Sequence, residues 1–365
     1  MKKIFLLFVT FIFSVNLFSQ SSALVLSGGG AKGAYEVGIW KAMADFGLAK
    51  DVSVFSGTSV GSLNAALFAC TTPSNAEKIW RNRVNKSSLL KPKKLKKEET
   101  TSDLMVVNSS GNENNPGLET LEESLEKLLG TLGNIMEEVA NETLDYITTS
   151  NPSAGLYDRS ELRDMIKSVL SVEKLNLTSK TVYATAVRKT QLGYKLFSSL
   201  FEHDYSHYFK LNDQPSNEIA TDILLASSAV PGVYETQTLP AETVENGRPV
   251  GRVYEYLDGG VQAAGGRNTP IVPVLKHPEI STVYIVYLMS EEEKDYNFTS
   301  DELQRIEKSG KKFIEIYPSE SLGNFFNGTI DFSPEKVAKL IDLGYSDGAA
   351  VFSKMGYFKV PPAFR

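Results

Sequence analysis

The sequence is poor in cysteine, in histidine and in net positive charge. Cys70 is the single cysteine among 365 residues, which excludes an intramolecular disulfide framework and a thiolate-rich metal site. His203, His207 and His277 are the only three histidines, so few imidazoles are available for acid–base catalysis. The formal net charge of -6 argues against general nucleic-acid binding, which favours a basic face.

The first residues of the sequence have the pattern of a targeting segment. Met1, Lys2 and Lys3 are followed by a nearly continuous apolar stretch over residues 4–15, and then by polar and small residues. This stretch is shorter than the roughly 20 residues that span a bilayer. We therefore predict a signal peptide over residues 1–22 and export to a periplasm, an outer membrane or the extracellular space. An uncleaved N-terminal anchor is the alternative.

Beyond residue 22 the apolar pattern predicts an α/β fold. A short apolar run at 23–26 ends in three glycines and is followed by a helix over 34–46. A second strand at 52–55 leads through a sharp turn into a helix over 62–70. Strands that alternate with helices are typical of a parallel sheet. We predict a three-layer α/β/α sandwich with a mostly parallel central sheet.

The alternation of predicted strands and helices continues toward the end of the chain. Asp158 and Glu161 are expected to form a capping box for a helix that runs to Leu170. Further strands are expected at 181–187, 253–257, 282–288 and 313–317, and further helices at 219–227 and 334–345. No linker divides these elements, so residues 23–365 are expected to form one domain, with its motifs in a core over 23–270.

Residues 86–150 are interpreted as a helical insertion in that domain. Five lysines lie within Lys91–Lys97, and apolar residues recur at three- and four-residue spacing from Leu118 to Val139. A basic loop followed by a bent amphipathic helix is expected. The ordinary interpretation is a solvated loop and a helix that packs on the core. The alternative is a segment that contacts an anionic membrane or micelle surface.

Residues 57–61, Gly-Thr-Ser-Val-Gly, fit the pattern G-x-S-x-G. They lie directly after a predicted strand and directly before a predicted helix. A serine on such a turn exposes its hydroxyl, and the flanking glycines let the backbone fold tightly. The N–H groups of the following helix favour developing negative charge. Ser59 is therefore the candidate nucleophile of a hydrolase.

Residues 28–33, Gly-Gly-Gly-Ala-Lys-Gly, form a glycine-rich loop after the first strand. A hydrolase needs backbone N–H donors where an oxyanion forms, and glycines let the main chain come close. The alternative is a dinucleotide site, because the loop also fits G-x-G-x-x-G and Asp51 lies at the distance of a ribose-binding acid. The serine turn at the end of the next strand favours the hydrolase.

A serine nucleophile needs a base, and two candidates follow it in the chain. Asp258 ends a predicted strand before two glycines, which would keep its carboxylate accessible, although Asp-Gly-Gly is also common in ordinary turns. His277 would complete the Ser, Asp, His order of α/β-hydrolases, or it is a surface-loop histidine. His203 and His207, four residues apart, could share a helix face at the surface. The residue pattern leaves these alternatives open.

Taken in order, the three motifs resemble the patatin-like phospholipase family, whose pattern is a glycine-rich loop, G-x-S-x-G and D-G-[AG]. Two further blocks, residues 155–158 and 226–232, are similar to the family, and the resemblance runs from about residue 23 to residue 270. It implies a Ser59–Asp258 dyad without histidine, lipid acyl-ester substrates and no metal or other cofactor. It also implies an oxyanion hole and supporting motif positions at Gly28, Gly29, Gly30, Lys32, Gly33, Gly57, Gly61, Gly259 and Gly260.

The expected activity is that of a lipid acyl hydrolase of the phospholipase A or lysophospholipase type. The reaction would pass through a Ser59 acyl-enzyme, with Asp258 as general base. Two alternatives stand beside it: an esterase with a Ser59, Asp258, His277 triad, and a non-catalytic module that binds lipid or another surface.

Overall fold

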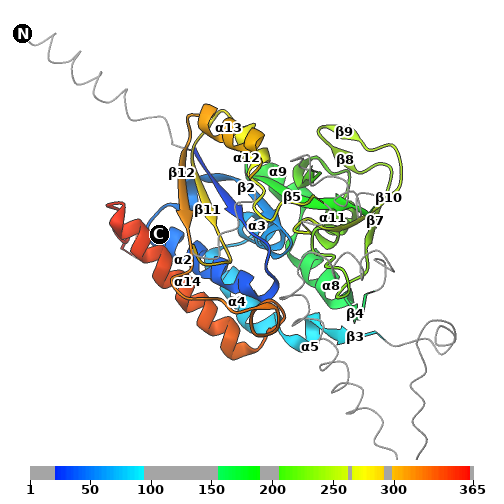
Figure 1. Ribbon diagram of the computed structural model, residues 1–365, viewed down its shortest axis with the longest axis horizontal. Helices are drawn as coiled ribbons and strands as arrows, with labels where there is room; N and C mark the ends of the chain where they lie inside the picture. Colours follow the sequence, from blue (N-terminus) through cyan, green and yellow to red (C-terminus); the bar gives the residue numbers. More distant parts are fainter. Residues whose placement is uncertain (1–20, 94–154, 190–204, 262–264, 292–297, 362–365) are drawn as a thin grey trace, which may run out of the picture.

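The structure is a computed structural model and describes residues 21–93, 155–189, 205–261, 265–291 and 298–361. A central sheet carries helices on both of its faces, which confirms the three-layer α/β/α sandwich (Figure 1). Side chains of β1 (Ser21–Leu26) alternate between the two layers. Leu24 and Leu26 belong to a large core on one face, and Ala23 and Val25 to a smaller core on the other.

The sheet is parallel in its larger part and antiparallel at one side. The parallel strands lie in the order β12-β11-β1-β2-β5, and they span Lys312–Ile316, Ile280–Val286, Ser21–Leu26, Val52–Thr58 and Thr181–Arg188. The strands β6 (His207–Lys210) and β10 (Tyr254–Asp258) pair antiparallel with β5, and β7 (Gln237–Leu239) pairs antiparallel with β10. Two short ribbons pair β3 (Lys91–Pro92) with β4 (Tyr157–Asp158), and β8 (Val244–Glu245) with β9 (Arg248–Pro249).

The helices on the larger core come mainly from the first half of the chain and from its end. They are α2 (Ala34–Asp45), α3 (Val60–Cys70), α4 (Pro73–Arg83), α8 (Ser160–Val169), α9 (Val172–Leu177), α11 (Asn217–Ser227) and α14 (Pro334–Lys354). The smaller core is covered by α12 (Val272–Leu275) and α13 (Ser300–Lys308). Short turns complete the fold: η1 (Gly30–Gly33), η2 (Ala49–Asp51), α5 (Lys86–Leu89), η4 (Leu211–Asp213) and η6 (Phe325–Thr329).

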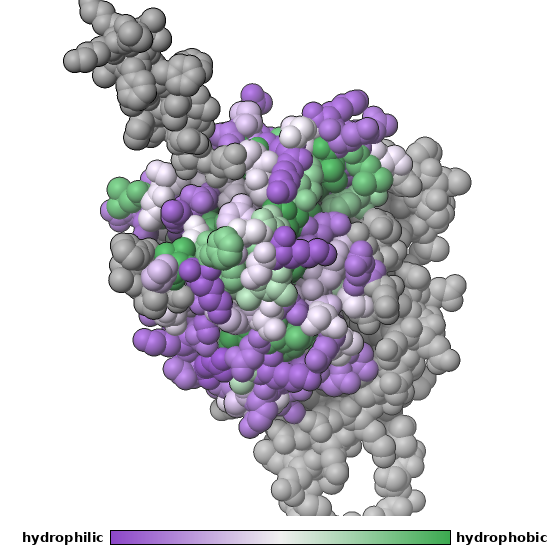
Figure 2. Space-filling view, turned by 90° about the vertical axis from the view of Figure 1, so that its left-hand side faces the viewer, coloured by the Kyte–Doolittle hydropathy of each residue, from purple (hydrophilic) through white to green (hydrophobic). Residues whose placement is uncertain are grey.

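The helices α2 and α14 pack backbone against backbone (Figure 1). A methyl group on Gly344 would lie 2.0 Å from the Tyr35 carbonyl oxygen, and one on Gly38 would lie 2.1 Å from that of Ile341. Only glycine allows such an approach. The opposite side of α14 carries exposed charged residues. On this side of the molecule, hydrophilic side chains surround smaller hydrophobic areas (Figure 2).

Two sequence-based expectations differ from the structure. The capping box is wrong, because Asp158 ends β4 and its carboxylate instead accepts hydrogen bonds from the Ser160 N–H (2.9 Å) and hydroxyl (3.0 Å). The last helix, α14, continues nine residues beyond Tyr345, because Gly344 and Gly348 pack against α2 instead of ending it. The strand that delivers Asp258, β10, is antiparallel to β5 and β7, which agrees with a sheet expected to be mostly, not wholly, parallel.

Several expectations fall on residues that the structure does not describe. They are the apolar stretch over 4–15, the stripe from Leu118 to Val139 and most of the Lys91–Lys97 run, so the signal peptide and the amphipathic helix stay predictions. Of the segment 86–150, residues 86–93 are described: Leu89 and Leu90 are buried in the large core, and β3 pairs with β4. Within the described ranges, no helix is both long and apolar enough to span a membrane.

We expect Gly344→Ala to lower the free energy of unfolding by about 1–3 kcal/mol, because the added methyl overlaps the Tyr35 carbonyl. This sign is opposite to the intrinsic preference of helices for alanine. Ser346→Ala, at an exposed position of the same helix, is expected to stay within about 0.5 kcal/mol of wild type. Urea unfolding followed by circular dichroism measures both, and equal stabilities would contradict the close helix contact.

Candidate active site

Ser59 lies on the sharp turn between β2 and α3, as the sequence predicts. Its backbone is in a rarely populated conformation, with φ 54° and ψ -127°. Both flanking glycines are needed there: a methyl on Gly57 would lie 2.2 Å from the Gly61 carbonyl oxygen, and one on Gly61 would lie 2.4 Å from that of Leu26. The Ser59 carbonyl is held by the Ser62 hydroxyl at 2.7 Å, which keeps the turn in place.

The strand register brings Asp258 to the level of this turn. Thr58, the residue before the nucleophile, pairs with Thr185 on β5. On β10, Asp258 pairs with Ala186, the next residue of β5. The end of β10 is also close to the β5 backbone, since a methyl on Gly259 would lie 2.3 Å from the Thr185 carbonyl oxygen. The two predicted catalytic residues, which are far apart in the sequence, therefore meet at one end of the sheet.

Asp258 is a buried carboxylate with one unpaired oxygen. Its Oδ1 accepts a hydrogen bond from the Gly260 N–H at 2.7 Å, while Oδ2 is buried and has no hydrogen-bond partner among the described residues. Burial raises the pKa of the Asp258 carboxyl from 3.8 to about 6, although the Ser59 hydroxyl and the Gly260 N–H lower it in part. The hydroxyl thus lies near the carboxylate without completing a hydrogen bond of normal geometry to it. Catalytic pairs commonly tighten only when substrate binds.

Ser227, at the end of α11, connects the nucleophile to the aspartate. Its hydroxyl accepts a hydrogen bond from the Ser59 N–H at 3.0 Å, and its carbonyl accepts one from the Gly259 N–H at 3.4 Å. Two residues on, the Ala229 carbonyl accepts the N–H of Asp258 at 3.0 Å. In the sequence, residues 226–232 stand out only by their resemblance to the family. Their role lies in contacts between segments that are distant along the chain.

The glycine loop lies beside Ser59, and Asn268 holds its first residue. The Gly28 N–H donates to the Asn268 side-chain oxygen at 2.9 Å, and the Asn268 amide donates back to the Gly28 carbonyl at 3.2 Å. In contrast, the N–H groups of Gly29 and Gly30 have no hydrogen-bond partner in the described part of the chain. These two donors, more than Gly28, are therefore available to bind an oxyanion.

The other end of this loop packs against neighbouring elements. A methyl on Gly33 would lie 2.4 Å from a methyl carbon of Val60 at the start of α3. The Lys32 side chain extends toward Gly328, where a methyl would lie 2.7 Å from its Cε atom. The motif residues at 32 and 33 thus support the loop and do not line the space in front of Ser59.

A buried polar network, which the sequence did not predict, contacts the glycine loop at Gly33. The Asn64 amide of α3 donates to the Glu36 carboxyl at 2.7 Å and to the Gly33 carbonyl at 2.9 Å. Trp80 of α4 donates its indole N–H to the Asn64 side-chain oxygen at 2.9 Å. Burial raises the pKa of Glu36 well above its ordinary value, although the hydrogen bond from Asn64 lowers it in part. In the sequence, the only indication of this network is Glu36 itself, a single acidic residue within an apolar helix.

An apolar cavity of about 130 Å³ opens beside Ser59 and Gly30. It extends between α3, α4, α8 and α11, and aliphatic side chains form most of its walls. Its lining includes Leu63 and Leu67 of α3 and Met165 and Ile166 of α8. Such a cavity binds apolar groups and excludes water.

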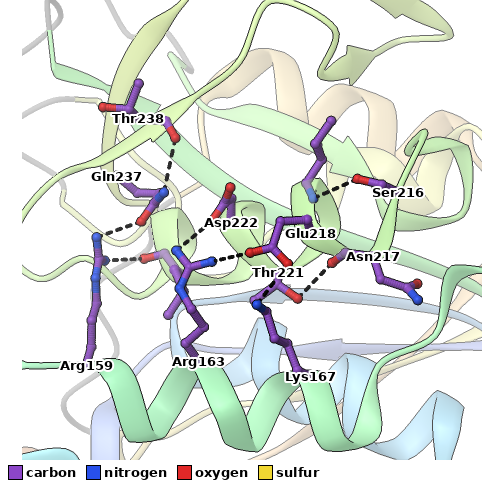
Figure 3. Close-up of polar contacts among 12 residues, drawn as sticks. Arg159, Arg163, Lys167, Ser216, Asn217, Glu218, Thr221, Asp222, Gln237 and Thr238 are labelled. Atoms are coloured by element: carbon purple, nitrogen blue, oxygen red, sulfur yellow. Dashed lines mark hydrogen bonds and ion pairs between the residues drawn. The ribbon is translucent and has the colours of Figure 1, made fainter.

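Polar contacts join α8 and α11, two of the helices beside this cavity (Figure 3). Arg163 pairs with Asp222 at 2.6 Å and with Glu218 at 3.1 Å, and Lys167 pairs with Glu218 at 2.8 Å. One turn earlier, Arg159 donates to the Leu225 carbonyl at 3.1 Å. Surface pairs of this kind add little stability. The apolar face of α8, with Leu162, Met165 and Ile166, is buried and lines the cavity.

The histidines do not belong to this site. The His277 Nε2 contacts the Tyr183 hydroxyl at 3.0 Å, and its Nδ1 contacts Glu279 at 2.7 Å. His277 precedes β11 whereas Ser59 follows β2, and these strands run in the same direction, so the two residues lie at opposite ends of the sheet. The proposed Ser59, Asp258, His277 triad is therefore wrong. His207 lies in β6, not on a helix, and bonds to Glu245 at 3.0 Å, while His203 is outside the described residues.

The dinucleotide alternative fails for the same geometric reason. Asp51 precedes β2, whereas the glycine loop follows the parallel strand β1, so the acid and the loop lie at opposite ends of the sheet. Among the described residues, no group of three histidine, cysteine, aspartate or glutamate side chains is placed to hold a metal ion.

Comparisons with known proteins agree with the motif order. The family model described as patatin-like phospholipase matches residues 24–273. A patatin-like phospholipase domain-containing protein 7 of Rattus norvegicus is 47% identical over 53 residues, which are 14% of this chain and 4% of that protein. The lysophospholipase nte1 of Aspergillus terreus is 45% identical over 54 residues, which are 15% of this chain and 3% of that protein. The matched segments are thus a small part of these relatives.

Among solved structures, VipD from Legionella pneumophila is similar with a TM-score of 0.44 and 14% identity. The similarity covers 92% of this chain and 67% of that one.

We expect Asp258→Asn to stabilise the fold in a pH-dependent way. Because the folded-state pKa of about 6 lies above the ordinary 3.8, charging the buried carboxyl as the pH rises costs about 3 kcal/mol, which the neutral amide avoids. The variant should gain most of this amount above about pH 7 and almost none near about pH 4. Chemical denaturation at both pH values measures it. Asp164→Asn, at an exposed position of α8, is the matched control, and a gain independent of pH would contradict the burial of Asp258 as a charge.

Proposed function

Because the chain belongs to the patatin-like phospholipase family, we propose that it is a lipid acyl hydrolase with Ser59 as nucleophile and Asp258 as general base. One observation carries the proposal: a strained serine turn, a buried carboxylate with a free oxygen and an apolar cavity converge at one end of the sheet. A serine, a base and unpaired N–H donors are the parts that acyl transfer requires.

The reaction would have two steps. Asp258 Oδ2 takes the Ser59 proton while the serine Oγ attacks the ester carbonyl carbon, and the oxyanion is held by the Gly29 and Gly30 N–H groups. The intermediate collapses as the alcohol oxygen leaves with the proton from Asp258, which gives an acyl-enzyme. Water then attacks the acyl carbon, Asp258 takes its proton and returns one to Ser59, and the fatty acid is released.

The raised pKa suits Asp258 to this role. At neutral pH the group is mostly ionised, yet a carboxylate with a pKa of about 6 is a stronger base than an ordinary aspartate. Its strength is still modest, so the backbone donors must supply much of the rate enhancement. In serine hydrolases one such donor is worth a factor of about 100 to 1,000.

The cavity supports a lipid acyl chain as the group that binds. Its aliphatic walls offer an acyl chain about 0.8 kcal/mol for each buried methylene. The name of the Aspergillus relative makes a lysophospholipid the first substrate to test. We further propose export through residues 1–22 and contact of the 86–150 segment with a lipid surface, because of the basic run at Lys91–Lys97. A module that binds lipid without turnover is the competing function.

Ser59→Ala should abolish fatty-acid release from lysophosphatidylcholine, with a loss on the order of a thousandfold or more, because the acyl-enzyme forms on the Ser59 hydroxyl. Product analysis by mass spectrometry measures it. Ser346→Ala, exposed on α14 and far from the motifs in sequence, should behave like wild type.

A fluorophosphonate probe separates the two proposed functions. The hydrolase requires that wild type is labelled at Ser59 and that Ser59→Ala is not. A folded wild-type protein that binds lipid vesicles but fails to react with the probe would support the non-catalytic module instead.

A further inference from the structure

The segment 322–332 forms a compact turn directly before α14, drawn in orange in Figure 1. It includes the π-helical turn η6, in which the Thr329 N–H bonds to the Asn324 carbonyl and the Ile330 N–H to the Phe325 carbonyl, both at 3.0 Å. Asn324 and Asn327 also exchange hydrogen bonds between side chain and backbone. The segment therefore has a shape of its own. It lies outside residues 24–273, which the family model covers.

This segment sits on the glycine loop. A methyl on Gly30 would lie 2.2 Å from the Thr329 carbonyl oxygen, so the two backbones touch where glycine leaves space. On the other side, Gly328 rests against the Lys32 side chain. The loop that carries the unpaired N–H donors is therefore covered by residues from the last part of the chain.

The same segment contributes side chains to the cavity. Phe325, Ile330 and Phe332 line it together with Ser59 and Gly30. Phe332 is buried in the large core, and Ser333 caps α14 by accepting a hydrogen bond from the Lys336 N–H at 3.4 Å. Since α14 packs tightly on α2, this wall is fixed relative to the glycine loop.

We propose that the segment 322–332 selects acyl groups that are unbranched next to the ester carbonyl. The inference rests on the proposed hydrolase. When an ester carbonyl oxygen accepts hydrogen bonds from the Gly29 and Gly30 N–H groups, its first acyl carbon is two covalent bonds from that oxygen. The start of the acyl chain therefore lies close to Gly30. The cavity wall that segment 322–332 forms beside Gly30 then leaves room for a straight acyl chain. It collides with a branch at the carbon next to the carbonyl.

The test compares two soluble esters, p-nitrophenyl butyrate and p-nitrophenyl 2-methylbutyrate, in wild type, Phe325→Ala and Ile330→Ala. We expect the ratio of kcat/KM for the branched ester to that for the straight ester to rise by about tenfold or more in at least one variant, the usual effect of one methylene in an apolar pocket. A ratio measured on one preparation does not depend on how much of the protein is folded. Phe325→Leu provides a milder version if Phe325→Ala fails to fold.

Phe313→Ala is the matched control, because Phe313 packs in the smaller core on the opposite face of the sheet. It should lower stability and leave the ratio unchanged. If the Phe325 and Ile330 variants hydrolyse both esters with the wild-type ratio of kcat/KM, the inference is overturned. The proposed hydrolase activity would still stand. Absence of turnover of both esters by wild type, together with an unlabelled Ser59, would instead overturn the proposed function.

Discussion

A buried carboxylate beside a strained serine is the arrangement on which the rest of the site depends. Asp258 is surrounded by backbone: the Gly260 N–H binds one oxygen, and the Ala229 carbonyl holds its own N–H. No cation or imidazole compensates the buried charge in the described part of the site, so the pKa of the carboxyl rises. Burial that destabilises the folded protein at neutral pH is the same feature that makes the group basic. Function and stability are therefore opposed at this residue.

Close approach of main chains is the second constraint. The serine turn, the contact of the glycine loop with Thr329 and the crossing of α2 with α14 each leave no room for a side chain. These contacts form a series from the nucleophile to the C-terminal helix. The glycine loop touches the segment 322–332, that segment leads into α14, and α14 holds α2, the helix that follows the loop. The end of the chain is thereby part of the site's support.

Local patterns in the sequence predict the elements that carry the chemistry. The serine between two glycines, at the boundary of an apolar strand and a helix, is sufficient to place Ser59, because turn, strand and helix are all encoded within a few residues. The direction of β10 is not encoded in this way, because an apolar strand has the same sequence pattern whether its partner is parallel or antiparallel. The order of Ser59, Asp258 and His277 was equally uninformative, because order does not tell which end of the sheet a residue occupies.

Other parts of the site depend on pairs of residues that are distant in sequence. Asn268 clamps Gly28, and Ser227 accepts the N–H of Ser59, across more than one hundred residues in each case. The roles of these polar side chains follow from the tertiary fold and have no local signature. Phe325 and Ile330 likewise look like ordinary apolar residues until the fold brings them to Gly30. The family resemblance predicted the dyad, but it ended before this segment.

The pH dependence of kcat/KM tests the Ser59–Asp258 pair most directly. The base must be ionised, so kcat/KM of wild type should fall by about tenfold per pH unit below a midpoint near about 6, the pKa of the buried carboxyl. Above that midpoint the profile should be flat through neutral pH, and Asp258→Asn should lose nearly all activity while remaining folded. An Asp258→Asn enzyme with wild-type activity, or a wild-type profile without this acid limb, would contradict the account.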